Sequence, residues 1–213
     1  PIDISEILTE SSEQLLKDYD TLHITGIIDT YEGGLEFLKS YDDKKNLILF
    51  LGSSFGNFTP DDGKLFLEKI FFTMKSDDLF LIGLDLVKDK NILESAYDDS
   101  QGVTAKFNLN VLSRINDELD ADFDINNFSH YSIYNENAQR IEMNLKSLVS
   151  QSVIIGKSNL SLNLDKGELI HTEYSHKYRV SQIKKLLSDV GFEFKNMWLD
   201  EEKHFSLTLV SKN

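Results

Sequence analysis

Two apolar runs on either side of a helix-like segment constrain this chain most. Residues 46–52 read Asn-Leu-Ile-Leu-Phe-Leu-Gly, and residues 78–85 form a second run of the same kind. Continuous apolar runs of this length are typical of strands that are covered on both faces. Between them, Thr59 is placed to cap a helix that Pro60 begins. Strand, helix and strand in this order predict a parallel sheet with a right-handed crossover.

The rest of the chain predicts an insertion into this sheet. Helices are expected over residues 5–19, with Ser5 as cap, and 32–41, with a strand at 23–28 between them. Residues 88–118 are mostly helical in pattern, and several short alternating segments over 131–161 predict an antiparallel patch. The first pattern resumes near Tyr178, with a helix capped by Ser181 and ended by Gly191. Strands at 192–199 and 204–210 follow, joined by an acidic turn. We therefore expect an α/β sheet domain over 1–86 and 178–213, and an inserted α+β lobe over 87–177.

Composition excludes several classes of function. Lysine and arginine number 22 against 36 aspartates and glutamates, which gives a net charge of −14. Such a surface repels phosphate backbones and anionic lipid, so we expect no nucleic-acid or membrane partner. The chain has no cysteine, which excludes disulfides, thiolate zinc sites and a cysteine nucleophile. No apolar run approaches the roughly 20 residues of a membrane span, and the cytoplasm is the default location.

Small and polar residues follow the first apolar run, in the segment LGSSFGNFTP. Gly52 and Gly56 would let the backbone approach a ligand closely, and Asn57 could bind an amino group and a carboxylate. A glycine-rich connection in which Asn57 only caps a turn explains the segment too. Asp85 ends the next strand at the same edge of the sheet, although pairing with Lys88 is an equal explanation. Asp3 could hold a ribose or serve as an ordinary helix-start acid.

The segment HTEYSHKY at residues 171–178 is rich in hydrogen-bonding groups. A metal site is not expected, because the spacing of His171, Glu173 and His176 is not that of a helical ligand pair. In an extended strand, His171 and Glu173 share a face with Ser175, and Tyr174 points the other way. A carboxylate beside a hydroxyl can bind both nitrogens of an imidazole. A solvated polar strand is the alternative interpretation.

Taken together, these segments resemble a known enzyme family. The runs LGSSFGNFTP, DLVKD, AYDD, GVTAKFNLNVL, ADFD, RIEM and HTEYSHKY are similar, in the same order, to the histidine Nα-methyltransferases. The resemblance covers almost the whole chain. It implies S-adenosyl-L-methionine as cofactor, L-histidine as substrate, and trimethylation of its α-amino group to hercynine on the route to ergothioneine. The fold it implies is the Rossmann-like sheet of class I methyltransferases, with which the terminal hairpin agrees.

The resemblance also implies a role for particular residues. The acidic residue that would hold the cofactor ribose corresponds to Asp3. The short stretch that would contact the adenine corresponds to Asp29, Thr30 and Tyr31. The substrate would be held by Gly52, Asn57, Tyr97, Met143, Glu173 and Ser175. Of these, Asn57 would orient the amine and Tyr97 the carboxylate, which makes them the catalytic candidates. Glu173 and Ser175 would bind the imidazole, with Met143 lining its pocket.

The chain also departs from the family pattern. The glycine-rich loop after the family's first strand has no counterpart, nor has an N-terminal helical segment that supplies a further tyrosine. We therefore expect an N-terminally incomplete sheet, weak or absent cofactor binding, and an open strand edge near Phe50 that invites self-association of an otherwise monomeric chain. Two other functions stay open: methylation of another amino acid or small amine, and a truncated, non-catalytic binding module.

Overall fold

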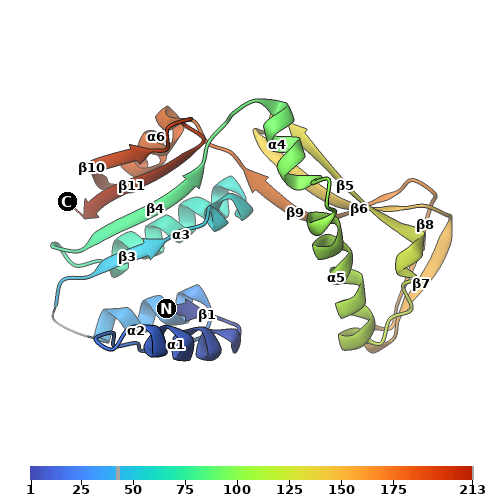
Figure 1. Ribbon diagram of the computed structural model, residues 1–213, viewed down its shortest axis with the longest axis horizontal. Coiled ribbons are helices and arrows are strands. Elements are labelled where there is room, and N and C mark those ends of the chain that lie inside the picture. Colours follow the sequence, from blue (N-terminus) through green and yellow to red (C-terminus); the bar gives the residue numbers. More distant parts are fainter. Residues whose placement is uncertain (42–43, 213) are drawn as a thin grey trace.

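The computed structural model describes residues 1–41 and 44–212, and it divides into a sheet lobe and an inserted lobe, on the left and right of Figure 1. The sheet lobe contains β1 (Ile2–Asp3), α1 (Ile7–Asp18), β2 (Ile27–Ile28), α2 (Tyr31–Tyr41), β3 (Leu47–Phe50), the 3-10 helix η1 (Ser54–Asn57), α3 (Pro60–Thr73), β4 (Leu79–Asp85), α6 (Val180–Val190), β10 (Phe192–Leu199) and β11 (Phe205–Lys212). Within the described residues, no helix has the length and apolar character needed to cross a membrane.

The main sheet has the strand order β10-β11-β4-β3. β3 and β4 are parallel, and β11 runs antiparallel to both of its neighbours. The α/β class and the closing hairpin are therefore as predicted. The expected cap of α3 is also present, because the Thr59 hydroxyl accepts a hydrogen bond from the Asp62 N–H at 3.2 Å. Ser181 is not a cap: α6 follows Arg179, whose N–H is satisfied by the Gln182 side chain at 2.7 Å.

One face of this sheet carries the core. Helices α3 and α6 pack there on β4, and the buried cluster contains Phe66, Leu67, Ile70, Phe80, Ile82, Leu84, Ile183 and Leu187. Alternate residues of a strand point to opposite faces, so Leu47 and Leu49 of β3 point away from this core. They remain 55% and 53% exposed. The prediction that β3 is covered on both faces is therefore wrong within the described part of the chain.

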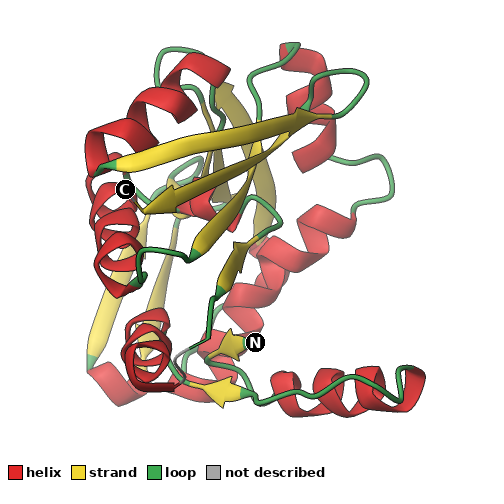
Figure 2. Ribbon diagram, turned by 90° about the vertical axis from the view of Figure 1, so that its left-hand side faces the viewer, coloured by secondary structure: helices red, strands yellow, loops and turns green. Residues whose placement is uncertain are grey.

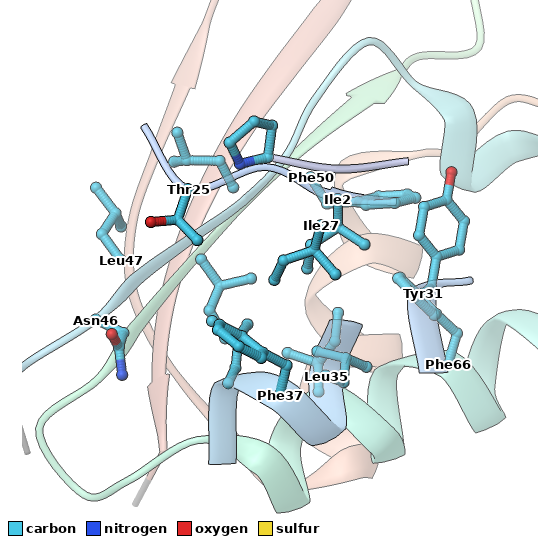
Figure 3. Close-up of a pocket in the computed structure, with 15 residues that line it drawn as sticks. Ile2, Thr25, Ile27, Tyr31, Leu35, Phe37, Asn46, Leu47, Phe50 and Phe66 are labelled. Carbon is cyan, nitrogen blue, oxygen red and sulfur yellow. The ribbon is translucent and has the colours of Figure 1, made fainter. Parts of the chain in front are cut away.

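The N-terminal strands form a small sheet of their own. β1 and β2 are parallel and pair over two residues each, so the predicted strand at 23–28 is reduced to Ile27–Ile28. Helix α1 lies out to one side (Figure 2), and Leu8 is its buried residue. An apolar cavity of about 550 Å³ separates the pair from β3 (Figure 3) and is lined in part by Ile2, Ile27, Leu47 and Phe50.

The inserted lobe is built on an antiparallel sheet. It contains α4 (Lys90–Tyr97), α5 (Val103–Leu119), η2 (Ile125–Asn127), β5 (Phe128–Asn135), β6 (Arg140–Ser147), β7 (Gln151–Ile155), η3 (Gly156–Ser158), β8 (Leu160–Leu164) and β9 (Leu169–His176). Strands β5, β6 and β9 form one sheet, and β7 pairs with β8. The chain enters and leaves the lobe side by side, since Leu86 and Tyr178 form a parallel bridge.

A close backbone contact joins the two lobes. His176, at the end of β9, donates from Nδ1 to the Gly56 carbonyl oxygen at 2.9 Å. An added Cβ at Gly56 would lie only 2.8 Å from the His176 carbonyl oxygen, so only glycine permits this approach. The contact holds the turn between β3 and α3 against β9.

Candidate active site

A polar cavity of about 320 Å³ lies where the carboxyl ends of β3 and β4 meet β9. It is lined by Gly52, Ser53, Ser54, Asn57, Asp85, Tyr97, Glu173, Ser175, Lys177 and Phe205. Ligands of α/β sheets bind at this end of the strands. The structure therefore brings together, from three separate segments, the residues Gly52, Asn57, Tyr97, Glu173 and Ser175 that the sequence singled out.

The turn after β3 shapes one wall of this cavity. Gly52 and Ser53 both have positive φ, at 76° and 62°. That conformation costs a serine roughly 1–3 kcal/mol and persists only where surrounding contacts hold it. Here the Ser53 hydroxyl accepts a hydrogen bond from the Asp85 N–H at 2.9 Å, which ties the turn to the end of β4. The turn leads directly into η1, which ends at Asn57.

Strand β9 supplies the opposite wall and contains a bulge. Its pairing with β6 shifts between Met143, opposite Glu173, and Asn144, opposite His171, which leaves Thr172 as the extra residue. A bulge adds one residue to one strand and breaks the alternation of faces. His171 therefore stacks on Tyr174, with ring centroids 3.9 Å apart, and the prediction that it shares the Glu173 face is wrong. Glu173 and Ser175, beyond the bulge, still line the cavity together.

Lys177 is a cavity-lining residue that sequence reasoning missed. Its side chain is only 1% exposed and pairs with an Asp85 carboxylate oxygen at 2.9 Å. Nζ also donates to the Tyr97 hydroxyl at 2.9 Å and to the Ser175 hydroxyl at 2.8 Å. The other Asp85 oxygen accepts from Lys88 at 2.6 Å, so Asp85 both lines the cavity and makes the pair that the alternative interpretation expected. The sequence did offer a signal for this position. Lys177 lies two residues after Ser175, and in an extended strand both side chains share one face.

Tyr97 is held at both its side chain and its backbone. Its hydroxyl donates to the Ser175 oxygen at 2.8 Å. Its carbonyl oxygen lies 2.7 Å from Nε2 of His130, whose Nδ1 lies 2.9 Å from the Asn108 side-chain nitrogen. Because an amide nitrogen only donates, Nδ1 accepts and Nε2 carries the proton. His130, for which the sequence offered no role, thus anchors the end of α4 at the cavity.

Glu173 carries a carboxylate into a half-buried position. Burial raises its pKa above the ordinary value of 4.5, while the nearby positive charges of Lys177 and His171 oppose the rise. Burial raises the pKa because it removes water from the charged form of the carboxyl group. This loss of solvation is larger than the opposing effect of the two positive charges. A ligand that donates a hydrogen bond to this carboxylate would restore part of that lost solvation.

Met143 lies behind the cavity rather than in its wall. It is 3% exposed and packs with Leu93, Tyr134 and Ile141. Tyr97 packs against the same apolar cluster. Met143 can therefore support Tyr97 and Glu173 from behind, and contact with a ligand would require a movement of the wall.

A second hollow, of about 290 Å³, lies at the carboxyl ends of β1 and β2. Asp3, Thr30 and Tyr31 line it together with Ile4 and Glu32. Asp29 is not in its wall, since its carboxylate accepts from the Thr30 N–H at 2.6 Å at the start of α2. The Tyr31 ring contacts Phe50, the last residue of β3, at 5.5 Å between centroids. Tyr31 therefore links the second hollow to β3, the strand whose carboxyl end borders the polar cavity.

Among the described residues, one cluster has the composition of a metal site. Asp200, Glu202 and His204 place ligand atoms within 4.8 Å of one another in the turn between β10 and β11. The Asp200 carboxylate accepts from the N–H groups of His204 and Phe205. These hydrogen bonds are those of a tight hairpin turn and account for the arrangement.

Comparison with known proteins identifies the family. Residues 1–212 match the model of the histidine-specific, S-adenosylmethionine-dependent methyltransferases. The chain belongs to this family. The resemblance inferred from the sequence motifs is thereby confirmed, and the sheet lobe has the class I methyltransferase fold that it implied.

Individual relatives agree with this assignment. The histidine N-alpha-methyltransferase of Mycobacterium tuberculosis (strain CDC 1551 / Oshkosh) is 37% identical over 213 residues, which are 100% of this chain and 66% of the relative. The protein of the same name from Mycolicibacterium smegmatis is 35% identical over 99% of this chain and 65% of the relative. An L-tryptophan methyltransferase from Psilocybe serbica is 27% identical over 88% of the chain and 54% of the relative. The chain thus spans about two thirds of the length of the mycobacterial relatives.

Proposed function

We propose that this chain acts in the S-adenosylmethionine-dependent methylation of the α-amino group of L-histidine, which yields hercynine on the route to ergothioneine. The observation that carries the proposal is the shared cavity of Asn57, Glu173 and Ser175. These residues come from two lobes, and their polar groups match the two ends of a histidine molecule. The names of the mycobacterial relatives support the same substrate.

The two ends of the cavity suit different parts of the substrate. Glu173 would accept from one imidazole nitrogen, and the Ser175 hydroxyl would bind the other. Asn57 and the backbone at Gly52 would hold the amino acid end, close to the turn after β3. Tyr97 lies between the two ends, with its hydroxyl already bonded to Ser175. Because that proton is already given to Ser175, Tyr97 would keep this hydrogen bond when the substrate is bound, and the backbone near Gly52 would hold the substrate carboxylate in its place.

The second hollow fits the nucleoside end of the cofactor. A carboxylate, from Asp3, can accept from both ribose hydroxyls, and the exposed ring of Tyr31 offers an apolar surface beside it. Asp3 already accepts from the Ser5 N–H at 2.8 Å through Oδ1, and its Oδ2, to which no described residue donates, would accept from the ribose. Thr30 would contribute to this end, whereas Asp29 would act from outside the wall. When bound, S-adenosylmethionine supplies an electrophilic methyl group.

The chain's own residues would contribute orientation rather than a nucleophile. A neutral amine attacks the methyl group in line, so alignment of its lone pair and exclusion of water control the rate. Asn57 would orient the amine by accepting from it. Ser53, locked to Asp85, would keep the turn that carries Asn57 in place.

The intracellular supply of S-adenosylmethionine supports the cytoplasm as the place of reaction.

Titration calorimetry with L-histidine, followed by mass spectrometry after incubation with S-adenosylmethionine, tests the proposal. We expect histidine to bind and to gain mass in methyl steps. Glu173→Ala should weaken binding roughly tenfold or more, because a charge-assisted hydrogen bond is lost. Glu136→Ala, at an exposed acid of the same lobe, is the matched control. A protein that binds no histidine, or binds it equally well in both variants, would contradict the assignment.

A different amine substrate is the second candidate, and the L-tryptophan methyltransferase among the relatives favours it. An indole has one N–H and no acceptor nitrogen, so it could use Glu173 but not a donor hydroxyl at Ser175. Competition between histidine and tryptophan distinguishes the two. A non-catalytic binding module is the remaining possibility, and it predicts no methylated product with either amino acid.

A further inference from the structure

Two hydroxyls and one ammonium form a closed hydrogen-bonded triangle at the ring-binding end of the cavity. Lys177 Nζ donates to the Tyr97 and Ser175 oxygens, and the Tyr97 hydroxyl donates to Ser175. Lys177 is itself held by the Asp85 carboxylate at 2.9 Å. With these three partners, every proton of its ammonium group is used. The lysine therefore has no proton left for a ligand.

The consequence falls on the Ser175 hydroxyl. A hydroxyl oxygen accepts two hydrogen bonds and donates one. Both acceptor positions of Ser175 are occupied, by Lys177 and by Tyr97. Its own proton is therefore the one group that it can offer to the cavity. A ring nitrogen that faces Ser175 must accept, and a protonated nitrogen there would meet a donor instead.

The charges around the triangle point the same way. Glu173 lies on the ligand side, with His171 close enough to lower its pKa. Asp85 lies behind Lys177 and is shared with Lys88. Tyr134 of β5, packed behind the cavity, also lies within the electrostatic reach of Lys177. A ring nitrogen at Ser175 therefore lies near a buried cation, while the nitrogen at Glu173 faces a carboxylate.

On the basis of the proposed function, we propose that Lys177 is a positioning residue that makes this site select the neutral imidazole ring. It acts through Ser175, by occupying an acceptor position of that hydroxyl so that its proton points to the ligand. The bound ring carries its N–H toward Glu173 and its unprotonated nitrogen toward Ser175. The doubly protonated imidazolium is rejected because it has no acceptor nitrogen.

The experiment compares L-histidine with its 1,2,4-triazole analogue, whose ring stays neutral throughout the range tested. Calorimetric Kd values are measured for wild type, Lys177→Met, Lys177→Gln and Ser175→Ala. For wild type, the histidine Kd should rise about tenfold between about pH 7.5 and about pH 5.5, as the ring titrates near 6.5. Any pH dependence of the Kd of the analogue comes from the protein's own groups, including Glu173. This pH dependence is subtracted from the pH dependence of the histidine Kd to give the corrected pH response.

The variants separate positioning from structure. Lys177→Met should abolish most of the corrected pH response, whereas Lys177→Gln, whose amide still donates, should keep it. Ser175→Ala should also abolish it, and adding Lys177→Met to that variant should change nothing further. Circular dichroism verifies that each variant is folded. If Lys177→Met does not fold, Ser175→Ala and Lys177→Gln still decide the matter.

Each outcome bears on one proposal or on both. If Ser175→Ala or a folded Lys177→Met keeps the full corrected response, the role of Lys177 is refuted while the histidine assignment stands. Loss of the response in Lys177→Gln would show that charge, not hydrogen-bond donation, is decisive, and it too would refute the mechanism. If wild type binds neither histidine nor the analogue, the proposed function fails and the inference fails with it.

Discussion

At the scale of single residues, the site depends on groups that are individually unfavourable. Ser53 adopts a left-handed conformation, Lys177 is buried, and Glu173 is half-buried with a raised pKa. Each lowers stability unless its partners compensate. A convergence of unfavourable groups on one cavity is typical of functional sites. Replacing them should therefore separate stability from affinity.

Glu173→Gln should stabilise the chain while weakening histidine binding. An acid whose pKa is raised in the folded state stabilises fully below its ordinary value of 4.5, and that contribution is lost as pH rises through the folded pKa. The glutamine does not titrate, so the melting temperature of the variant should exceed that of wild type increasingly from below pH 4.5 to neutrality. Thermal melts across this range measure the difference. A constant or shrinking difference would contradict the assignment of the raised pKa to burial.

His130→Phe should destabilise the inserted lobe. The substitution leaves the Tyr97 carbonyl oxygen without its hydrogen bond and removes an acceptor from the buried Asn108 amide. Leaving such groups unsatisfied costs about 1–3 kcal/mol. Urea unfolding followed by circular dichroism measures this loss. His23→Phe, at a histidine of the N-terminal segment, is the control and should leave the midpoint nearly unchanged.

At the scale of elements, the junction between η1 and β9 decides whether the cavity exists. Gly56→Ala would push a Cβ to 2.8 Å from the His176 carbonyl oxygen. Backbone cannot yield as a flexible side chain can, so we expect a loss of about 1–3 kcal/mol and a marked loss of histidine affinity. Gly26→Ala, whose added Cβ would meet nothing closer than 3.4 Å, should do neither. Calorimetry and urea unfolding of both variants provide the comparison.

The start of α5 provides a prediction about pH. The Asp99 carboxylate accepts from the N–H groups of Val103 and Thr104, which lowers its pKa from 3.8 to about 2. Because the folded pKa is depressed, its stabilisation is present above pH 3.8 and is lost as pH falls toward about 2. Asp99→Asn should therefore melt lower than wild type at neutral pH, with the gap closing over that interval. Asp98→Asn, which makes the same charge change one residue earlier, is the matched control.

The elements also show how far the sequence alone could predict this molecule. The apolar run at β3 and the Thr59 cap are local signals, and both elements form where they were expected. The bulge at Thr172 is not local, because it arises from the pairing of β9 with β6, and it displaced His171 from its expected face. Lys177 was missed for a related reason. Lysines are rarely buried, and two of its three partners, Asp85 and Tyr97, come from distant segments.

At the scale of the whole molecule, the strand order of the main sheet leaves β3 at an edge and one face uncovered. Strand pairing places Leu49 beside Leu81, Leu81 beside Leu209, and Trp198 beside Leu207. These side chains share the face opposite α3 and α6, where Leu47, Leu49 and Trp198 are about half exposed. The sequence pattern was correct that β3 is apolar on both sides. The described part of the chain leaves the second face of β3 exposed.

This apolar face should make the chain self-associate as its concentration rises. Contiguous exposed apolar surface favours association. Within the described residues β3 is also an edge strand, and an edge strand presents backbone groups that can pair with another chain. Leu49→Lys places a charge on this face, at the edge strand β3, and should shift the population toward monomer. Leu65→Lys is the matched control, because Leu65 is 54% exposed against 53% for Leu49 but lies on α3. Sedimentation velocity over a concentration series measures both. Association that survives Leu49→Lys, or that Leu65→Lys suppresses equally, would show that the chain does not associate through the open face of its sheet.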